Sequence, residues 1–191
     1  MKNILLILGH PRKQSLCGAL ADAYRAGADE AGHTVESIHL GSLDFDPILR
    51  NGYDKPQALE PDLVNVQKQI ARADHLVFVY PTWWGGLPAL LKGFIDRVFL
   101  PGFAFKYREN SLRWDRLLIG KSAHLLVTMD SPPWYYRWVS RMPGHHQMKR
   151  TILGFSGINP VRISSFGPVK TSKKAQREKW LVAATQIGKA S

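Results

Sequence analysis

Cysteine is nearly absent from this chain of 191 residues, because Cys17 is the only one. No disulfide can form within the chain, so a reducing compartment such as the cytoplasm is the expected location. Long apolar runs are also missing: no stretch approaches the roughly 18 apolar residues that a membrane span needs. The apolar run Ile4–Leu8 is too short for the core of a signal peptide, and no small-residue cleavage site follows it. We therefore expect a soluble protein.

Several nucleotide and metal motifs are absent as well. A P-loop would need Gly-Lys-Ser/Thr after the first strand, and a dinucleotide fingerprint would need G-x-G-x-x-G, but neither occurs there. No spacing of Cys and His indicates a metal site, so we expect no metal. The basic residues form no nucleic-acid-binding motif, and we expect no nucleic acid as a partner.

Positive charge is concentrated in the second half of the chain. Residues 1–100 contain 10 Lys/Arg and 11 Asp/Glu, whereas residues 101–191 contain 16 and 4. Such a field favours anionic partners, for example a phosphorylated cofactor or an acidic protein or membrane surface. A basic surface that only keeps the protein in solution would explain the same counts.

The most informative stretch runs from residue 76 to residue 99. The apolar run 76–80 predicts a parallel strand that is covered on both faces, and Pro81 ends it because proline has no N–H to donate. From Leu87 onward, apolar residues recur with the spacing of a helix that buries one face.

The loop between this strand and this helix contains Thr82, Trp83, Trp84, Gly85 and Gly86. It follows the carboxyl end of a strand, where open α/β sheets bind their ligands. Two indoles offer flat apolar walls, and two glycines let the backbone approach a planar ring. The alternative is that both indoles plug the edge of the sheet.

A second strand-to-helix loop lies near the N-terminus. The strand Ile4–Leu8 is followed by a polar loop, and Ser15 stands where it can cap the next helix. Free N–H groups and the positive end of the helix dipole make such a place an anion site, and Arg12 and Lys13 add positive charge. An ordinary capped helix with solvated basic residues is the alternative.

The remaining pattern completes an alternation of strands and helices. Further strands are expected over 34–40, 123–129 and 160–166, and helices over 62–72, 147–155 and 171–189. The aromatic segment 101–107 is irregular and indicates a lid over a pocket or an interface patch, and 130–146 is a loop rich in rings.

Five strands that alternate with helices predict an α/β protein with a doubly wound parallel sheet. In the flavodoxin-like strand order 2-1-3-4-5, the loops 9–15, 81–87 and 129–146 lie side by side at the switch point. We find no internal repeat and no linker, so residues 1–191 are expected to form a single domain.

Two long motifs resemble the NAD(P)H:quinone oxidoreductase family. They are His10-Pro-Arg-Lys-Gln-Ser15 and the stretch from Tyr80 to Phe99, and Phe103-Ala-Phe-Lys-Tyr107 is similar to a further aromatic segment of that family. The resemblance implies a flavodoxin-like homodimer that carries FMN or FAD. It also implies ping-pong chemistry, in which hydride passes from a nicotinamide to the flavin and then to a quinone-like acceptor.

The resemblance assigns residues to two roles. Tyr135 and His145 are the counterparts of a tyrosine and a histidine that assist hydride transfer, and could supply a proton or stabilise charge on the reduced flavin. This loop is longer than the family's, which leaves the register of the two residues open, and a packed loop tip is the alternative. The flavin would be held by residues of three loops: His10, Ser15, Leu16, Cys17, Pro81, Thr82, Trp83, Trp84, Gly85 and Thr128.

We prefer FMN over FAD, because FAD-binding quinone reductases often have additional C-terminal residues. NADPH is preferred over NADH as the donor, because the basic half of the chain suits a 2′-phosphate. A homodimer is expected because several aromatic residues exceed what one domain needs to bury. These residues are Trp114, Trp134, Tyr136 and Trp138.

An alternative from another class is a regulatory subunit of a membrane potassium-efflux system, since similar folds serve there. The last helix carries Lys173, Lys174, Arg177 and Lys179, which suit an acidic partner or a lipid surface. A one-electron carrier like flavodoxin fits less well, because flavodoxins tend to be acidic.

Overall fold

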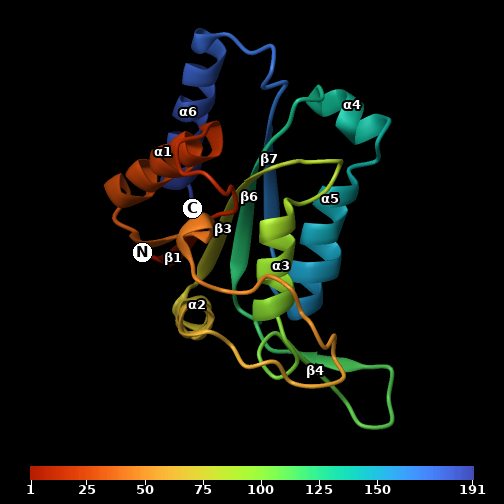
Figure 1. The fold of residues 1–191 in the computed structure, drawn as a ribbon. Helices are drawn as coiled ribbons and strands as arrows, with labels where there is room; N and C mark the ends of the chain where they lie inside the picture. The colour runs from red at the N-terminus through yellow and green to blue at the C-terminus, as the bar shows by residue number, and fades with distance from the viewer.

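The computed structural model describes residues 1–191 and centres on a five-stranded parallel sheet of order β2-β1-β3-β6-β7 (Figure 1). This is the predicted order 2-1-3-4-5, so the prediction of a flavodoxin-like doubly wound sheet is confirmed. The strands are β1 (Asn3–Leu8), β2 (Thr34–His39), β3 (His75–Pro81), β6 (Ser122–Thr128) and β7 (Val161–Phe166).

Helices cover both faces of the sheet and divide the core into two clusters. One cluster of 14 buried residues joins the sheet to α1 (Leu16–Glu30) and α6 (Lys174–Lys189). The other, of 28 residues, joins the opposite face to α2 (Pro61–Arg72), α3 (Ala89–Val98) and the segment that follows β6. Because β3 lies between the clusters, all seven of its residues are buried. None of the helices combines the length and apolar character that a membrane crossing requires.

Three segments differ from the sequence prediction. The irregular stretch after α3 contains an antiparallel pair, β4 (Phe105–Tyr107) with β5 (Trp114–Arg116). The predicted loop after β6 contains two short helices, α4 (Pro133–Trp138) and α5 (Pro143–His146), and the predicted helix at 147–155 is a π-helix, η2 (Gln147–Gly154). A strand of three residues or a helix of four to six is too short to produce a hydrophobic period.

The long segment between η1 (Leu40–Ser42) and α2 is fastened to the core by Arg97, whose side chain is completely buried. Its guanidinium donates to the carbonyl of Asp46 at 2.6 Å and to the carbonyl of Ala58 at 2.8 Å. It also pairs with the Glu60 carboxylate at 2.9 Å. A buried charge is tolerated only when such partners surround it, so Arg97 fixes both ends of the 46–60 segment.

Helices α1 and α6 approach so closely that glycine is required at the contact. A Cβ on Gly27 would lie 2.0 Å from the carbonyl oxygen of Thr185, and a Cβ on Gly188 would lie 2.1 Å from that of Tyr24. Because both obstacles are backbone atoms, only a shift of one helix could make room for a side chain.

We expect Gly27→Ala to lower the free energy of unfolding by about 1–3 kcal/mol, because overpacking outweighs the better helix propensity of alanine. Urea denaturation measures the change. Ala183→Leu, which adds atoms on the exposed face of α6, is the control and should change stability by less than about 0.5 kcal/mol. Equal stability of Gly27→Ala and the unmodified protein would contradict the close approach.

Candidate functional site

The loops that follow β1, β3 and β6 meet at Thr128. The N–H of Thr82 donates to the carbonyl of Thr128 at 2.7 Å, and the Sγ of Cys17 lies 3.3 Å from the Thr128 hydroxyl. A cavity of about 290 Å³ opens here, at the carboxyl edge of the sheet. Of the ten predicted cofactor residues, eight line it: His10, Ser15, Leu16, Cys17, Pro81, Thr82, Trp83 and Thr128.

One end of this cavity has the donors that a phosphate requires. Ser15 caps α1 by accepting the Gly18 N–H at 3.1 Å, which leaves its own O–H free to donate. The N–H groups of Leu16 and Cys17 make no hydrogen bond within the chain. They point from the positive end of a helix of 15 residues, which favours an anion.

Two arginines add positive charge to the same cavity. Arg12 comes from the loop after β1 and Arg177 from the first turn of α6, and neither is paired with a carboxylate. The Arg177 guanidinium is oriented by the Ser172 hydroxyl, to which its Nε donates at 2.8 Å. The donor set therefore matches a dianionic phosphate group.

His10 is held as a neutral donor. Its Nδ1 accepts the Arg12 N–H at 3.0 Å, so the neutral ring carries its proton on Nε2. Partial burial lowers the pKa of His10, and the positive charge of Arg12 contributes to the shift. The ring packs edge-on against Trp83, with 5.7 Å between the ring centroids.

The loop after β3 forms a tight turn with left-handed backbone. Trp83 and Gly86 exchange two hydrogen bonds of 3.1 and 2.9 Å, and φ is 52° at Trp84 and 76° at Gly85. Glycine adopts this conformation readily, but for Trp84 it is unfavourable, and such strain is characteristic of functional sites. The Trp84 side chain is fully exposed and that of Trp83 is 44% exposed, so the hypothesis that both indoles plug the sheet is wrong.

Tyr136 fastens this turn to the segment after β6. Its hydroxyl donates to the carbonyl of Gly85 at 2.9 Å and accepts the N–H of Gly144 at 3.0 Å. The same N–H lies 3.0 Å from the Gly85 carbonyl. Glycine at position 144 suits this contact, because a Cβ would lie 3.0 Å from that carbonyl oxygen, which is tighter than most Cβ contacts. The conformation of the turn therefore depends on α4 and α5.

The two predicted catalytic residues lie near this contact but do not line the cavity. Tyr135 is 43% exposed and its ring contacts Trp134 edge-on at 5.9 Å. His145 is buried, its Nε2 lies 2.9 Å from the Ser165 hydroxyl, and burial lowers its pKa to about 4. Their catalytic roles stay predictions.

Part of the cavity wall was not predicted from the sequence. Arg177 was assigned to a basic outer surface, and Val169 to no role. The predicted strand order places the end of β7 beside the end of β6, at the same edge of the sheet as the cavity. Residues that follow β7, such as Val169 and Arg177, could therefore have been expected there. The further lining residues are Arg12, Met129, Asp130, Val169 and Arg177.

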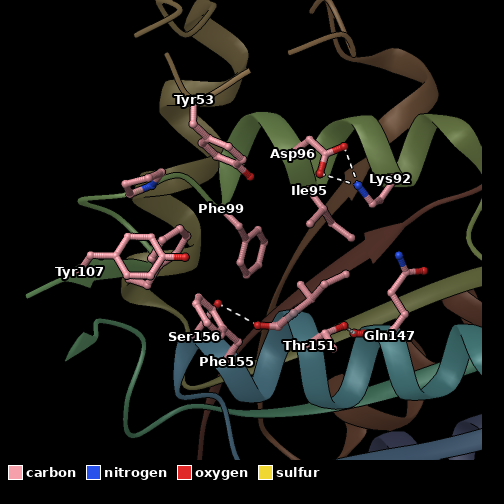
Figure 2. Close-up of a pocket in the computed structure, with 13 residues that line it drawn as sticks. Tyr53, Lys92, Ile95, Asp96, Phe99, Tyr107, Gln147, Thr151, Phe155 and Ser156 are labelled. Atoms are coloured by element: carbon pink, nitrogen blue, oxygen red, sulfur yellow. Dashed lines mark hydrogen bonds and ion pairs between the residues drawn. The ribbon is translucent and has the colours of Figure 1, made fainter. Parts of the chain in front are cut away.

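A second cavity of about 510 Å³ lies between α3, η2 and the β4–β5 pair. Figure 2 shows Ile95 of α3 facing Thr151 of η2 across it, with Phe155, which follows η2, and Tyr107 toward one end. The segment 101–107, predicted to be a lid or an interface patch, thus contributes to its wall, and Tyr53 reaches it from the segment fastened by Arg97.

The prediction of four surplus aromatic residues needs correction. Trp114 stacks on Phe155 at 4.4 Å and donates to its carbonyl, and Tyr136 is buried. Both therefore belong to the packing of this domain. Only Trp134 and Trp138, with exposed fractions of 63% and 72%, remain on the surface.

Fold and cavity together define a flavodoxin-like protein with a cluster of hydrogen-bond donors and an aromatic turn at its switch point. Residues 2–187 match the family described as flavodoxin-like fold, and the chain belongs to that family. The chain is 33% identical over 129 residues to an uncharacterized NAD(P)H oxidoreductase of Escherichia coli (strain K12), a match that covers 62% of this chain and 65% of that protein.

Two further similarities point the same way. NAD(P)H dehydrogenase (quinone) 1 of Cavia porcellus is 33% identical over 128 residues, 56% of this chain and 46% of that protein. The chain thus spans less than two thirds of these two relatives. The structure of an NAD(P)H:quinone oxidoreductase from Methanothermobacter marburgensis is similar with a TM-score of 0.86 and 26% identity over 98% of both chains. The predicted resemblance to NAD(P)H:quinone oxidoreductases is confirmed.

Replacing Tyr136 by phenylalanine should lower the free energy of unfolding by about 1 kcal/mol, because the hydroxyl loses its bond to the Gly85 carbonyl. Tyr135→Phe is the matched control, and it should leave stability unchanged because the Tyr135 hydroxyl has no partner in the chain. Denaturant unfolding of both variants measures the difference. Identical stability of the two would show that the Tyr136 hydroxyl does not fasten the turn.

Proposed function

We propose that this protein is a flavin-dependent NAD(P)H oxidoreductase that passes a hydride from NAD(P)H through bound flavin to a quinone or a similar two-electron acceptor. The observation that supports it best is one cavity whose lining joins phosphate donors to Trp83, the first residue of the aromatic turn 83–86. The names of the relatives support the same activity.

The residues of the cavity fit a flavin mononucleotide. Ser15, the free N–H groups of Leu16 and Cys17, and the two arginines would hold its one phosphate group. The N–H groups of Trp84 and Gly85, which have no partner in the chain, would lie at the polar edge of the ring and stabilise negative charge there. When bound, the flavin supplies two-electron hydride chemistry.

FMN is part of the proposal because only one cluster of phosphate donors lines this cavity. NADPH is the preferred donor because residues 101–191 carry the excess of positive charge that favours a 2′-phosphate. Cys17 has no chemical role in this scheme, since burial raises the pKa of its thiol to about 11. We place the enzyme in the cytoplasm.

The quinone-like acceptor and a homodimer complete the proposal. Tyr53 and Tyr107, at the rim of the second cavity, are 69% and 60% exposed. Coverage of this rim by a second copy would bury both rings. The alternative is a regulatory subunit that docks through the basic residues of α6; of these, Arg177 is exposed and also lines the cavity.

Ser15→Asp should abolish retention of FMN, because it places a carboxylate where the phosphate would bind. Aspartate caps a helix as well as serine does, so the melting temperature should not fall. Ser15→Asn is the matched control: it caps α1 without charge and should retain FMN. The flavin content of the two purified variants is the measurement. Equal flavin content in both would show that the loop after β1 does not contact the flavin phosphate.

Trp84 does not line the cavity, but its exposed indole would cover the outer side of a bound flavin ring, so Trp84→Ala should weaken FMN binding about tenfold. Stability should change by less than about 0.5 kcal/mol, because the side chain is fully exposed and both residues have the same left-handed strain. Fluorescence titration with FMN and urea denaturation measure the two effects. An unchanged affinity would show that Trp84 does not contact the flavin.

The proposed function is tested first by the visible spectrum of the purified protein, recorded without oxygen before and after NADPH. We expect the absorption bands of oxidised flavin, and we expect NADPH to bleach them. A subsequent quinone should restore the bands. A colourless protein that also fails to take up added FMN or FAD would contradict the proposal.

A further inference from the structure

The exposed tryptophans of this protein gather at one edge of the sheet. Four of the six tryptophans are exposed, and all four lie in segments that follow the carboxyl ends of β3 and β6: Trp83, Trp84, Trp134 and Trp138. The first two belong to the turn 83–86. The other two belong to α4, which contributes no residue to the cavity at the carboxyl edge. Their exposure therefore needs a separate explanation.

Helix α4 presents these two indoles on one side and its only buried residue on the other. Trp134 and Trp138 are four residues apart, so they lie on the same face of the helix. Tyr136 lies about half a turn from both, and its buried side chain binds the Gly85 carbonyl. Val139, which follows α4, is also exposed. The contact made by Tyr136 thus holds the tryptophan face outward.

Two arginines flank this face. The Arg137 guanidinium lies 5.1 Å from the centre of the Trp138 ring, and Arg141 follows one turn later. Both arginines are exposed, and neither is paired with a carboxylate. We call these residues the α4 patch: Trp134, Arg137, Trp138, Val139 and Arg141.

The chain that follows adds only positive charge to this end of the molecule. Residues 131–177 contain nine Lys/Arg and no Asp/Glu. Lys170 is exposed, and its N–H binds the Asp130 carboxylate at the carboxyl edge of the sheet. Lys173 and Lys174 are exposed at the start of α6, and Figure 1 shows the N-terminal end of α6 at the same end of the molecule as α4. Exposed indoles and an excess of positive charge therefore occur together.

We propose that the α4 patch docks this protein on an anionic lipid bilayer, with the indoles of Trp134 and Trp138 in the headgroup region. Tryptophan is enriched at that depth because its ring is apolar and carries one polar group. The two arginines would pair with lipid phosphates. The lysines after β7 would be attracted by the negative potential of the bilayer surface.

The size of the patch favours lipid over a protein partner. A tryptophan buries roughly 150–250 Å² when it is covered completely, so the exposed parts of Trp134 and Trp138 amount to about 300 Å². A stable protein interface needs about 800 Å² on each side and a matching shape. Insertion into a bilayer needs no matching surface, and its strength rises with the apolar area buried and with the attraction of basic residues to anionic lipid. Two copies joined patch to patch would bring four arginines together.

Docking through α4 turns the carboxyl edge of the sheet toward the membrane. The turn 83–86 lies next to α4, because Tyr136 joins the two. A quinone dissolved in the bilayer would then reach the flavin from the membrane side. This consequence rests on the proposed function, whereas the docking does not, because no residue of the patch lines the cavity.

Sedimentation with lipid vesicles tests the docking. The probes are vesicles of phosphatidylcholine alone and vesicles of equal parts phosphatidylcholine and phosphatidylglycerol, at about 0.15 M salt. We expect binding to the anionic vesicles and roughly tenfold weaker binding to the neutral ones. The protein is used as purified, with or without flavin, so a colourless protein that fails as an oxidoreductase still tests the docking.

Trp134→Ala and Trp138→Ala should each weaken binding to anionic vesicles about tenfold, because each removes apolar area from the lipid contact. Phosphatidylglycerol with brominated acyl chains should quench the fluorescence of the bound protein, and the double variant should lose most of this quenching. Leu112→Ala is the matched control. It removes a fully exposed apolar side chain between β4 and β5, at the far end of the molecule from α4 (Figure 1), and should bind normally.

Arg137→Gln should weaken the binding about fivefold, since one basic residue near an anionic surface contributes about that factor. Arg72→Gln is the matched control for charge. It removes the same charge from an exposed position at the end of α2, at the amino edge of the sheet, and should have less than about a twofold effect. All these side chains are exposed, so the melting temperature should not change.

Three outcomes would overturn the proposal. If the double variant of Trp134 and Trp138 binds anionic vesicles as tightly as the unmodified protein, the net charge of +11 adsorbs the protein without α4. If the double variant has a different mass in solution without lipid, measured by light scattering, the patch is a contact between copies. If the unmodified protein binds neither kind of vesicle, lipid is not the partner and an acidic protein takes its place.

Discussion

The site depends on the way Thr128 joins three loops that are remote in sequence. Its carbonyl accepts the N–H of Thr82 and its hydroxyl contacts Cys17, so the ends of β1, β3 and β6 keep a fixed relation. Parallel pairing brings those ends to one edge, and the strand order makes them neighbours. A ligand that bridges the loops therefore meets groups that are already in place, which reduces the ordering that binding requires.

The elements that the sequence predicted well are those that are buried on both sides. The strand expected at 76–80 is β3 at His75–Pro81, and the strand expected at residues 4–8 is β1 at Asn3–Leu8. Both are continuous apolar runs because a helical layer covers each face of the sheet. The loops after them were located correctly for the same reason, since a site at a switch point follows from strand order alone.

What the sequence could not provide is the detail of short segments stabilised by tertiary contacts. Tyr135 and Tyr136 are adjacent and chemically identical, and only the packing of α4 against the 83–86 turn buries the second of them. The exposure of Trp84 could not be predicted either. Left-handed backbone is normally expected at glycine or asparagine, so nothing in the sequence indicates it at a tryptophan. The charge of Arg177 is compatible with solvent and with an anion-binding cavity. Its position beside the cavity depends on the path of the loop between β7 and α6.

The clamp formed by Arg97 has a consequence for how such a protein can diversify. One buried guanidinium holds the chain near Asp46 and again near Ala58 and Glu60. The residues between these points form neither helix nor strand, and Tyr53 among them reaches the second cavity. Lengthening a loop between fixed ends costs little entropy. Insertions and substitutions in this interval can thus reshape the rim of that cavity, while the sheet and the loops at its carboxyl edge are inherited unchanged.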